Sequence, residues 1–285
     1  MSFATGISNA KERAELRWDP DSIPPFPAVA LKALKMMAGS DTSLLELCNL
    51  IRSDHAFSIA VLRLANSPLV AFSKEVTSIV QASMLLGFAR LRSLAITVGL
   101  RSYFSNSYTP LMSLCWRHSV ACAILAERSA KSRFLDGEFA YTAGILHDIG
   151  RVALAMVEAE TYANVLKRGA DQPEDLLESE RELCGIDHCE AGRSLMAAWD
   201  LPKVLVEIAA CHHAPQPLAL GTRSLIAPSC ALADALGFGV VRYRSPRRYE
   251  EILIQFPEPA RTRFPATAEE LAAEINREIR EIESA

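Results

Sequence analysis

Apolar residues along the chain recur at the spacing of α-helices, and capping or turn-forming residues separate the helical stretches. Val29, Leu31, Leu34 and Met37 share one face of a helix predicted over 28–37. Caps and breakers predict four further helices, at 44–51, 54–65, 79–86 and 88–104, the last two divided by Gly87. These five helices are predicted to form a first lobe. The chain enters it through residues 19–27, where four prolines predict a non-helical segment.

A polar, turn-rich stretch at 105–110 is predicted to be the boundary between two lobes. Beyond it, helical spacing predicts helices over 111–130, 137–146, 151–158, 160–168, 173–183, 188–199, 202–211 and 224–236. The tail over 268–284 places Leu271, Ile275, Ile279 and Ile282 on one stripe, which predicts an amphipathic helix that needs a partner surface. The β-leaning run 239–243 is too short to found a sheet. The predicted fold class is therefore all-α, a two-lobed helical domain.

Composition supports a globular chain and narrows its surroundings. Half of the 285 residues are apolar and 22% are charged, with a formal charge of −4, so charge gives no reason to expect nucleic acid or an anionic membrane surface. The seven cysteines are odd in number and none forms a C-x-x-C pair, which indicates reduced core thiols. No uninterrupted apolar run approaches the roughly 20 residues of a membrane span. We expect a cytoplasmic protein without membrane attachment.

Histidines and acids stand at places where helices could bring them together. His118 lies in mid-helix, His147 precedes Asp148, His188 opens a helix, and His212 with His213 closes one; Asp234 is the one charge in an apolar helical stretch. Each of these residues alone is more often a core or surface residue than a ligand. Together, imidazoles and carboxylates suit a divalent ion such as Mn²⁺, Fe²⁺, Zn²⁺ or Mg²⁺. Such an ion can polarise a phosphoryl oxygen and generate hydroxide near neutral pH. No other cofactor is expected.

Several ordered motifs resemble one known family. They are Ile23–Pro27, Leu62–Ser67, Ser78–Gly87 with Leu91–Leu94, Trp116–Ser119, Ile145–Gly150, Asp187–Gly192 and Cys211–His213. The stretch from about Pro24 to Gly237 is similar to the HDOD (HD-related output domain) branch of the HD superfamily of metal-dependent phosphohydrolases. The resemblance implies an all-helical domain and, for most members, a regulatory role in bacterial signalling. On this basis the chain divides into an N-terminal arm (1–18), an HDOD domain (19–238) and a C-terminal extension with the amphipathic helix (239–285).

The resemblance also implies a ligand set. His118, His147, Asp148 and Asp234 match the enzymatic HD pattern, and His188 with His212 or His213 matches the extra ligands of the two-metal HD-GYP phosphodiesterases. Two departures argue against cleavage of cyclic dinucleotides. Arg151 stands where the signature has lysine, and Ala214–Pro217 stands where those enzymes have Gly-Tyr-Pro.

Three functions are compatible with these observations. The favoured hypothesis is a non-enzymatic output module that acts through a signalling partner, such as a response regulator, a cyclase or a phosphodiesterase, or through a homodimer. The alternative is a metal-dependent phosphohydrolase that acts on a nucleotide or another phosphoester. Nucleic-acid binding is the weakest hypothesis. It would use the arginines around Tyr243 and Tyr249, a cluster more typical of a solvated turn: Arg242, Arg244, Arg247 and Arg248.

Overall fold

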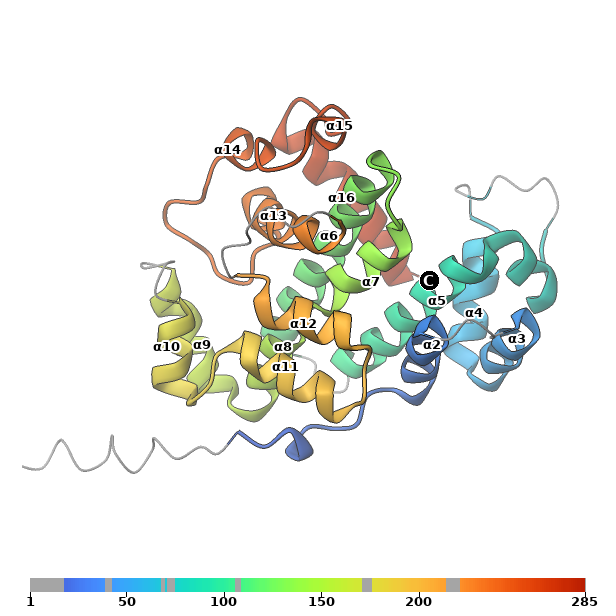
Figure 1. Ribbon diagram of the computed structural model, residues 1–285, viewed down its shortest axis with the longest axis horizontal. Helices are drawn as coiled ribbons and strands as arrows, with labels where there is room; N and C mark the ends of the chain where they lie inside the picture. Colours follow the sequence, from blue (N-terminus) through green and yellow to red (C-terminus); the bar gives the residue numbers. More distant parts are fainter. Residues whose placement is uncertain are drawn as a thin grey trace, which may run out of the picture.

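The computed structural model describes residues 18–38, 43–67, 70, 75–105, 109–170, 176–213 and 221–284, and within them it contains helices and no strand. The predicted all-α class is therefore confirmed (Figure 1). The longer helices are α2 (Ala28–Ala38), α3 (Leu44–Ser53), α4 (His55–Ala65), α5 (Ile79–Ser105), α6 (Pro110–Ser132), α7 (Gly137–Leu146), α8 (Ile149–Val157), α9 (Ala159–Gly169), α10 (Leu176–Cys184), α11 (His188–Ala198), α12 (Lys203–Cys211), α13 (Arg223–Ala233) and α16 (Ala268–Ser284).

Side-chain caps at the helix starts explain why the predicted boundaries agree closely with the observed ones. Ser43 and Glu46 form a reciprocal capping box at α3. The side chain of Asp54 accepts from the Phe57 amide at the start of α4, and Asp187 caps α11 in the same way. Each cap satisfies an amide that the helix itself leaves without a partner.

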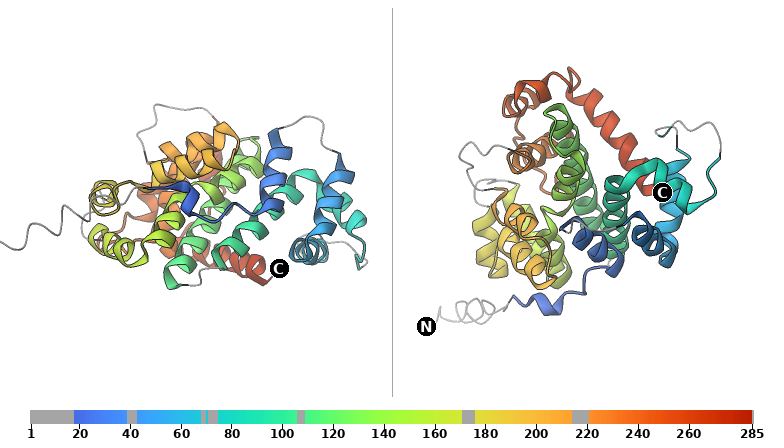
Figure 2. Two further views of the ribbon diagram at one scale, coloured as in Figure 1. Left: turned by 90° about the horizontal axis from the view of Figure 1, so that it is seen from below. Right: turned by 45° about the vertical axis from the view of Figure 1, so that its right-hand side comes forward.

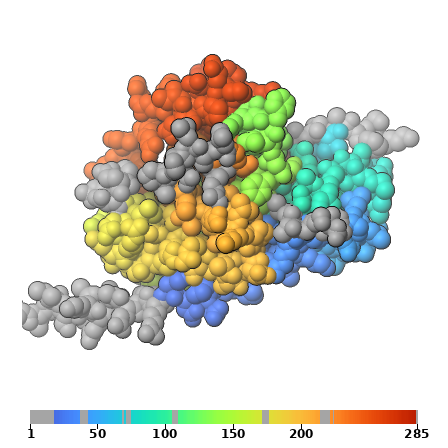
Figure 3. Space-filling model, in the orientation of Figure 1, coloured from blue at the N-terminus to red at the C-terminus, as the bar shows by residue number. Residues whose placement is uncertain are grey.

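Two buried apolar clusters hold the helices together. The smaller core joins one face of α2 with α3, α4 and the first part of α5, and the larger core joins the other face of α2 with the remaining helices. Helix α5 serves both, since Leu91 and Ala95 belong to the smaller core whereas Ile96 and Leu100 belong to the larger one. The smaller-core helices lie to one side of the molecule in Figure 3. The predicted boundary at 105–110 stays a prediction, because part of it lies outside the described residues.

Helix α6 runs through the larger core, and glycines allow its neighbours to approach closely. At Gly144 of α7, an added Cβ would lie 2.6 Å from the Cα of Ala123 on α6. At Gly150 of α8, an added Cβ would lie 1.9 Å from the carbonyl oxygen of His188 on α11. The two glycines thus bring the end of α7 and the start of α11 to the same place.

The C-terminal helix α16 packs onto the body of the protein, as its amphipathic pattern predicted. Leu271, Ile275 and Ile279 are fully buried in the larger core. Arg128 of α6 pairs with Glu274 and Glu278 on the flank of α16. Figure 2 shows α16 running down towards α5, where Arg101 donates to the carbonyl oxygen of Ile282 at 3.2 Å. The partner surface is therefore part of the same chain.

Helix α5 is long and apolar enough to cross a membrane by length and composition alone, which the sequence analysis did not anticipate. Gly87, with φ of 75°, kinks this helix, and three arginines lie along it. Its residues pack into both cores. These features are typical of a core helix, and the cytoplasmic location stays a prediction.

Several local predictions were wrong. Residues Pro20–Ser22 form a 3₁₀ turn inside the segment predicted to be non-helical, because a proline fits the first position of such a turn. The helix predicted over 224–236 ends at Ala233 and continues as a π-helical turn, Asp234–Phe238. Two short helices, α14 (Tyr249–Leu253) and α15 (Glu258–Arg261), were not predicted. Cys211 is exposed, although the other six cysteines are buried as predicted.

Replacing Gly150 with alanine tests the close packing of α8 on α11. Alanine favours a helix by about 1 kcal/mol over glycine, but the new Cβ would meet backbone atoms at 1.9 and 2.6 Å, which cannot rotate away. We expect a net loss of about 3 kcal/mol in the free energy of unfolding, seen as a lower melting temperature.

Gly169→Ala is the matched control. The nearest atom to its new Cβ is the tip of the Leu176 side chain at 2.6 Å, which can turn aside. Its stability should change by less than about 1 kcal/mol. Equal melting temperatures for the two variants would contradict the packing described.

Candidate metal centre

The predicted site residues come from five places along the chain that the helix packing draws together. His118 lies on α6, His147 and Asp148 lie between α7 and α8, and His188 opens α11. His212 and His213 follow α12, and Asp234 begins the π-helical turn after α13. The predicted convergence is observed, although the residues are far apart in sequence.

Asp148 lies at the centre of the cluster and is almost fully buried. Its Oδ1 atom lies 3.1 Å from the Nε2 of His212 and 3.4 Å from the Nε2 of His188, and the two nitrogens are 3.4 Å apart. Two ligands that each lie about 2.0–2.1 Å from a tetrahedral ion are themselves about 3.3–3.4 Å apart. The three atoms therefore have the spacing of one face of a coordination tetrahedron.

The other carboxylate oxygen of Asp148 faces a second pair of imidazoles. Its Oδ2 atom lies 3.5 Å from the Nε2 of His118 and 3.8 Å from the Nε2 of His147. The Nε2 of His147 is buried and has no hydrogen-bond partner. A buried polar atom without a partner is costly, and it points to a group that the protein is built to receive.

Three of the far ring nitrogens are anchored, which fixes the direction of the corresponding Nε2 atoms, whereas the buried Nδ1 of His118 has no hydrogen-bond partner among the described residues. His188 Nδ1 contacts Glu180 Oε2 at 2.6 Å, and His147 Nδ1 contacts the Gly144 carbonyl oxygen, also at 2.6 Å. His212 Nδ1 lies 2.8 Å from the Ala209 carbonyl oxygen. Carboxylates and carbonyls in these positions are typical of histidines that bind metals, because they set the tautomer and the ring orientation.

Asp234 and His213 occupy the margins of the cluster. Asp234 Oδ1 lies 3.3 Å from the Nδ1 of His118, the ring nitrogen that faces away from Asp148. The side chain of Asp234 is 26% exposed, whereas those of the inner residues are at most 3% exposed. His213 is exposed, and its ring lies 4.3 Å from the ring of His212 between centroids.

A buried cation completes the cluster, and the sequence analysis did not foresee its role. The Nε of Arg151 donates to Asp148 Oδ2 at 2.7 Å, and its Nη1 lies 3.6 Å from Glu180 Oε1. The hydroxyl of Tyr162 also donates to Glu180, at 2.9 Å. The sequence carried a signal for Glu180, because it shares a helical stripe with Leu176 and Cys184, both buried.

Two thiols were also missed as members of the cluster. The Sγ of Cys189 lies 3.6 Å from the Nε2 of His188. The Sγ of Cys230 lies 3.5 Å from the Nε2 of His118. C-x-x-C spacing marks neither thiol, because Cys189 lies next to His188 on α11 and also near His212, and Cys230 lies near His118 of another helix.

Charges in the cluster set opposite protonation preferences. Burial opposes ionisation of Asp148, but Arg151 and the imidazoles outweigh it and hold the pKa of this carboxyl well below its usual range. Burial lowers the pKa of His147 to about 3, so this ring is neutral and its nitrogen is free to bind a metal. Burial and Arg151 also oppose protonation of His188, yet Glu180 and Cys189 raise its pKa to about 10.

The residues present suit a divalent ion. The donor set combines carboxylate and imidazole, the Nε2 atoms are oriented, and one of them is buried without a partner. The groups that lie close enough to share an ion are Asp148, His188, His212 and His213 on one side and His118, His147 and Cys230 on the other.

The model of the HDOD domain family matches residues 23–215, more than half of the chain. The chain belongs to the HDOD family. Its fold is similar to that of an HDOD domain protein from Geobacter sulfurreducens, with 24% identity, a TM-score of 0.72 and 92% of each chain covered. A candidate phosphohydrolase from Shewanella amazonensis has 22% identity, a TM-score of 0.67 and 96% of each chain covered.

A candidate signal transduction protein from Marinobacter aquaeolei has 20% identity and a TM-score of 0.64, with 97% of this chain and 64% of that chain covered. None of the curated proteins matches the chain. These likenesses establish the helical fold and the family. The arrangement of side chains around Asp148 is what bears on chemistry in this HDOD domain.

Replacing Arg151 with methionine tests whether the guanidinium is needed to bury two acids. Asp148 and Glu180 would lose their cation, so we expect a loss of about 3–5 kcal/mol in the free energy of unfolding of the protein purified with chelator. Arg168→Met is the control. Its pair with Glu182 is about half exposed, so the loss should be below about 1 kcal/mol.

The pKa values of Asp148 and Glu180 determine how the stability lost in Arg151→Met depends on pH. Arg151 with the imidazoles holds the pKa of Asp148 below that of the unfolded chain, about 3.9, and His188 with Arg151 holds the pKa of Glu180 below its unfolded value, about 4.3. The stabilisation is thus complete above those values and is lost as the pH falls through the folded pKa values. The stability difference between wild type and Arg151→Met should be full at pH 7 and shrink in acid. A pH-independent difference would contradict the ion-pair account.

Proposed function

We propose that the chain is a regulatory output domain in which the histidine–aspartate cluster holds a divalent ion as part of a signalling state, not as a hydrolytic centre. The observation that carries the proposal is the Arg151–Asp148 ion pair at 2.7 Å. The central carboxylate already has an internal cation, so the cluster is electrostatically compensated without an ion. The membership of the HDOD family supports a role in signal transduction.

The inner donors would hold the ion. Asp148, His188 and His212 form the triangle described above, with His213 at its exposed edge. A bound divalent ion supplies Lewis acidity that polarises phosphoryl oxygens or lowers the pKa of water. In this chain Glu180 orients His188, Arg151 fixes the Asp148 carboxylate, and burial keeps His147 neutral. The partner that would read the state is a signalling protein, such as a response regulator or a cyclase or phosphodiesterase.

The second candidate is a metal-dependent phosphohydrolase. One observation favours it. The imidazoles of His147, His188 and His212 are oriented by contacts at their Nδ1 atoms, and their Nε2 atoms face the carboxylate of Asp148. Two features weigh against it. Arg151, which directly follows the His-Asp-Ile-Gly motif, already forms ion pairs with the buried acids Asp148 and Glu180. The donors around Asp148 are also buried, with the exception of His213.

Metal titration combined with turnover separates the two functions. Protein freed of metal should gain several degrees in melting temperature with Mn²⁺, Fe²⁺ or Zn²⁺, because an ion at 100 times its Kd stabilises the folded state by about 2.7 kcal/mol. Asp148→Asn should lose most of that gain while keeping its bond from Arg151. Neither protein should hydrolyse cyclic di-guanylate or bis(p-nitrophenyl) phosphate above the background of the metal alone.

Glu182→Gln serves as the surface control and should respond to metal like the wild type, because the side chain of Glu182 is about half exposed and pairs with Arg168. Turnover that requires metal in the wild type and disappears in Asp148→Asn would establish the hydrolase in place of the regulatory role. Absence of any metal-dependent rise in melting temperature would overturn the ion itself.

A further inference from the structure

The side of the cluster nearest α13 holds a group of donors that differs from a histidine–carboxylate set. His118, His147 and Cys230 offer one ligand atom each, and these atoms lie within 4.8 Å of one another. All three residues are buried. Cys230 lies one helical turn before Asp234, the acid that the family resemblance implied as a metal ligand.

The orientation of the His118 ring decides whether Cys230 or Asp234 can bind the same ion as His118. Asp234 contacts the Nδ1 atom of His118 at 3.3 Å. Cys230 contacts the Nε2 atom at 3.5 Å, and Asp148 Oδ2 lies at the same distance from that Nε2. An imidazole directs its two nitrogens to opposite sides. Cys230 is thus on the side of Asp148, and Asp234 is behind the ring.

Distances within this group suit a sulfur ligand. A zinc–sulfur bond of about 2.3 Å and a zinc–nitrogen bond of about 2.0–2.1 Å at the tetrahedral angle place the two ligand atoms about 3.5–3.6 Å apart. The separation between Cys230 Sγ and His118 Nε2 is 3.5 Å. A simple thiol–imidazole hydrogen bond would also give this separation, but it would leave the buried Nε2 of His147 without a partner.

We propose that the Oδ2 side of Asp148 forms a second ion position, distinct from the Asp148–His188–His212 triangle, at which Cys230 is a metal ligand with His118, His147 and Asp148. Asp234, 3.3 Å from the Nδ1 of His118, is then a positioning residue for that ring. This inference rests on the proposed metal-holding function. Four protein donors close the site, which is typical of structural sites, whereas catalytic sites keep a position open. A thiolate donor selects Zn²⁺ or Fe²⁺ over Mg²⁺ and Mn²⁺. The assignment therefore agrees with a regulatory role.

Gly239 supports the position of Asp234 behind the ring. An added Cβ at this glycine would lie 2.9 Å from Asp234 Oδ1. The carboxylate of Asp234 thus lies close to the backbone that follows the π-helical turn Asp234–Phe238.

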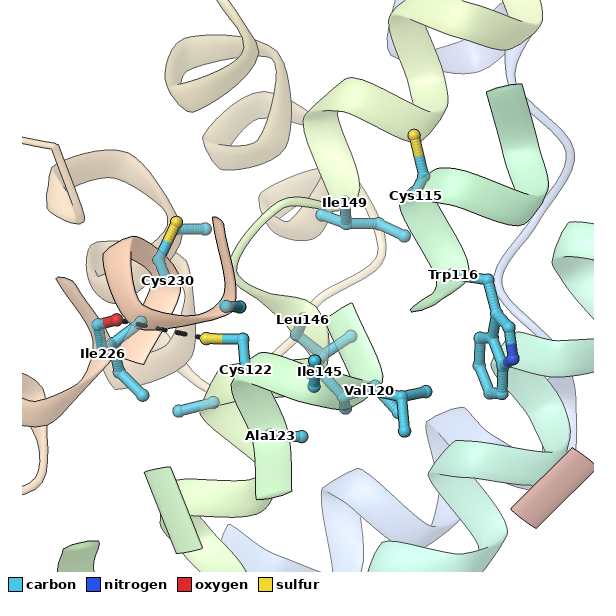
Figure 4. Packing of buried hydrophobic residues seen from close by; sticks show 14 of the residues in the cluster. Cys115, Trp116, Val120, Cys122, Ala123, Ile145, Leu146, Ile149, Ile226 and Cys230 are labelled. Atoms are coloured by element: carbon cyan, nitrogen blue, oxygen red, sulfur yellow. Dashed lines mark hydrogen bonds between the residues drawn. The ribbon is translucent and has the colours of Figure 1, made fainter. Parts of the chain in front are cut away.

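Cobalt(II) substitution in the full chain tests the assignment. Protein prepared with chelator is titrated with Co²⁺ alone, and bound cobalt is measured together with the near-ultraviolet thiolate-to-cobalt charge-transfer band. We expect the wild type to show the band and Cys230→Ser to lose it. Cys122→Ser is the matched control, since this buried thiol donates to the Ile226 carbonyl oxygen at 4.0 Å and should leave the band intact (Figure 4).

Two further variants separate the remaining possibilities. Cys189→Ser should keep the band, and a band lost here and kept in Cys230→Ser would overturn the assignment. Asp234→Asn should weaken cobalt binding by about 10- to 100-fold, as expected for a residue that orients a ligand, and keep the full band per bound ion. A weaker band per bound ion would place Asp234 among the ligands.

The outcomes distinguish this inference from the proposed function. If the wild type binds no cobalt, both are overturned. If cobalt binds without a charge-transfer band, the thiolate assignment alone is overturned. Should Cys230→Ser fail to fold, X-ray absorption of cobalt-loaded Cys189→Ser decides the question, because a sulfur neighbour of the cobalt supports the assignment and a shell of nitrogen and oxygen alone overturns it.

Discussion

The buried carboxylate of Asp148 is the feature on which the rest of the larger core depends. A charge taken out of water costs several kcal/mol unless ion pairs and hydrogen bonds replace its hydration. Here Arg151 donates to one oxygen, and imidazoles face both oxygens. These groups come from separate helices, so burying this single carboxylate requires α6, α8, α11 and α12 to meet. Gly144 and Gly150 make that meeting sterically possible.

The two oxygens of Asp148 have different surroundings, and this difference bears on function. Oδ2 is bonded to Arg151, whereas Oδ1 faces the nitrogens of His188 and His212. The guanidinium supplies a permanent positive charge, so the fold has no need of an ion for electrostatic balance. The imidazole nitrogens nevertheless retain the spacing of ligands. This internal compensation is the observation that supports the proposed regulatory role.

Much of the fold could be predicted from the sequence because its signals are local. Side-chain caps such as Asp54 and Asp187 and the stripe of α16 act within a few residues, and the predicted helices agree closely with the observed ones. The convergence of the predicted site residues followed from the family resemblance. The roles of Glu180 and Cys230 could not be predicted, because each depends on a side chain from another helix. The π-helical turn also escaped prediction, and so did the position of its first residue, Asp234, beside the Nδ1 of His118.

The helices that hold His118 and His147, α6 and α7, extend from the cluster to a groove that α5 of the smaller core also lines. Beyond His118, α6 presents Glu127 to a groove between the cores, and α7 presents Tyr141 to the same groove. There α5 contacts α7 through Thr97 and Tyr141, at 3.2 Å.

The far wall of that groove includes Glu278 and Ile282 of α16, which lies outside the residues matched by the family model. Because α6 and α7 touch through backbone atoms at Gly144, they cannot shift independently without separating a close-packed contact. Helices α6 and α7, packed closely at Gly144, therefore carry both the cluster residues His118 and His147 and part of the lining of the groove.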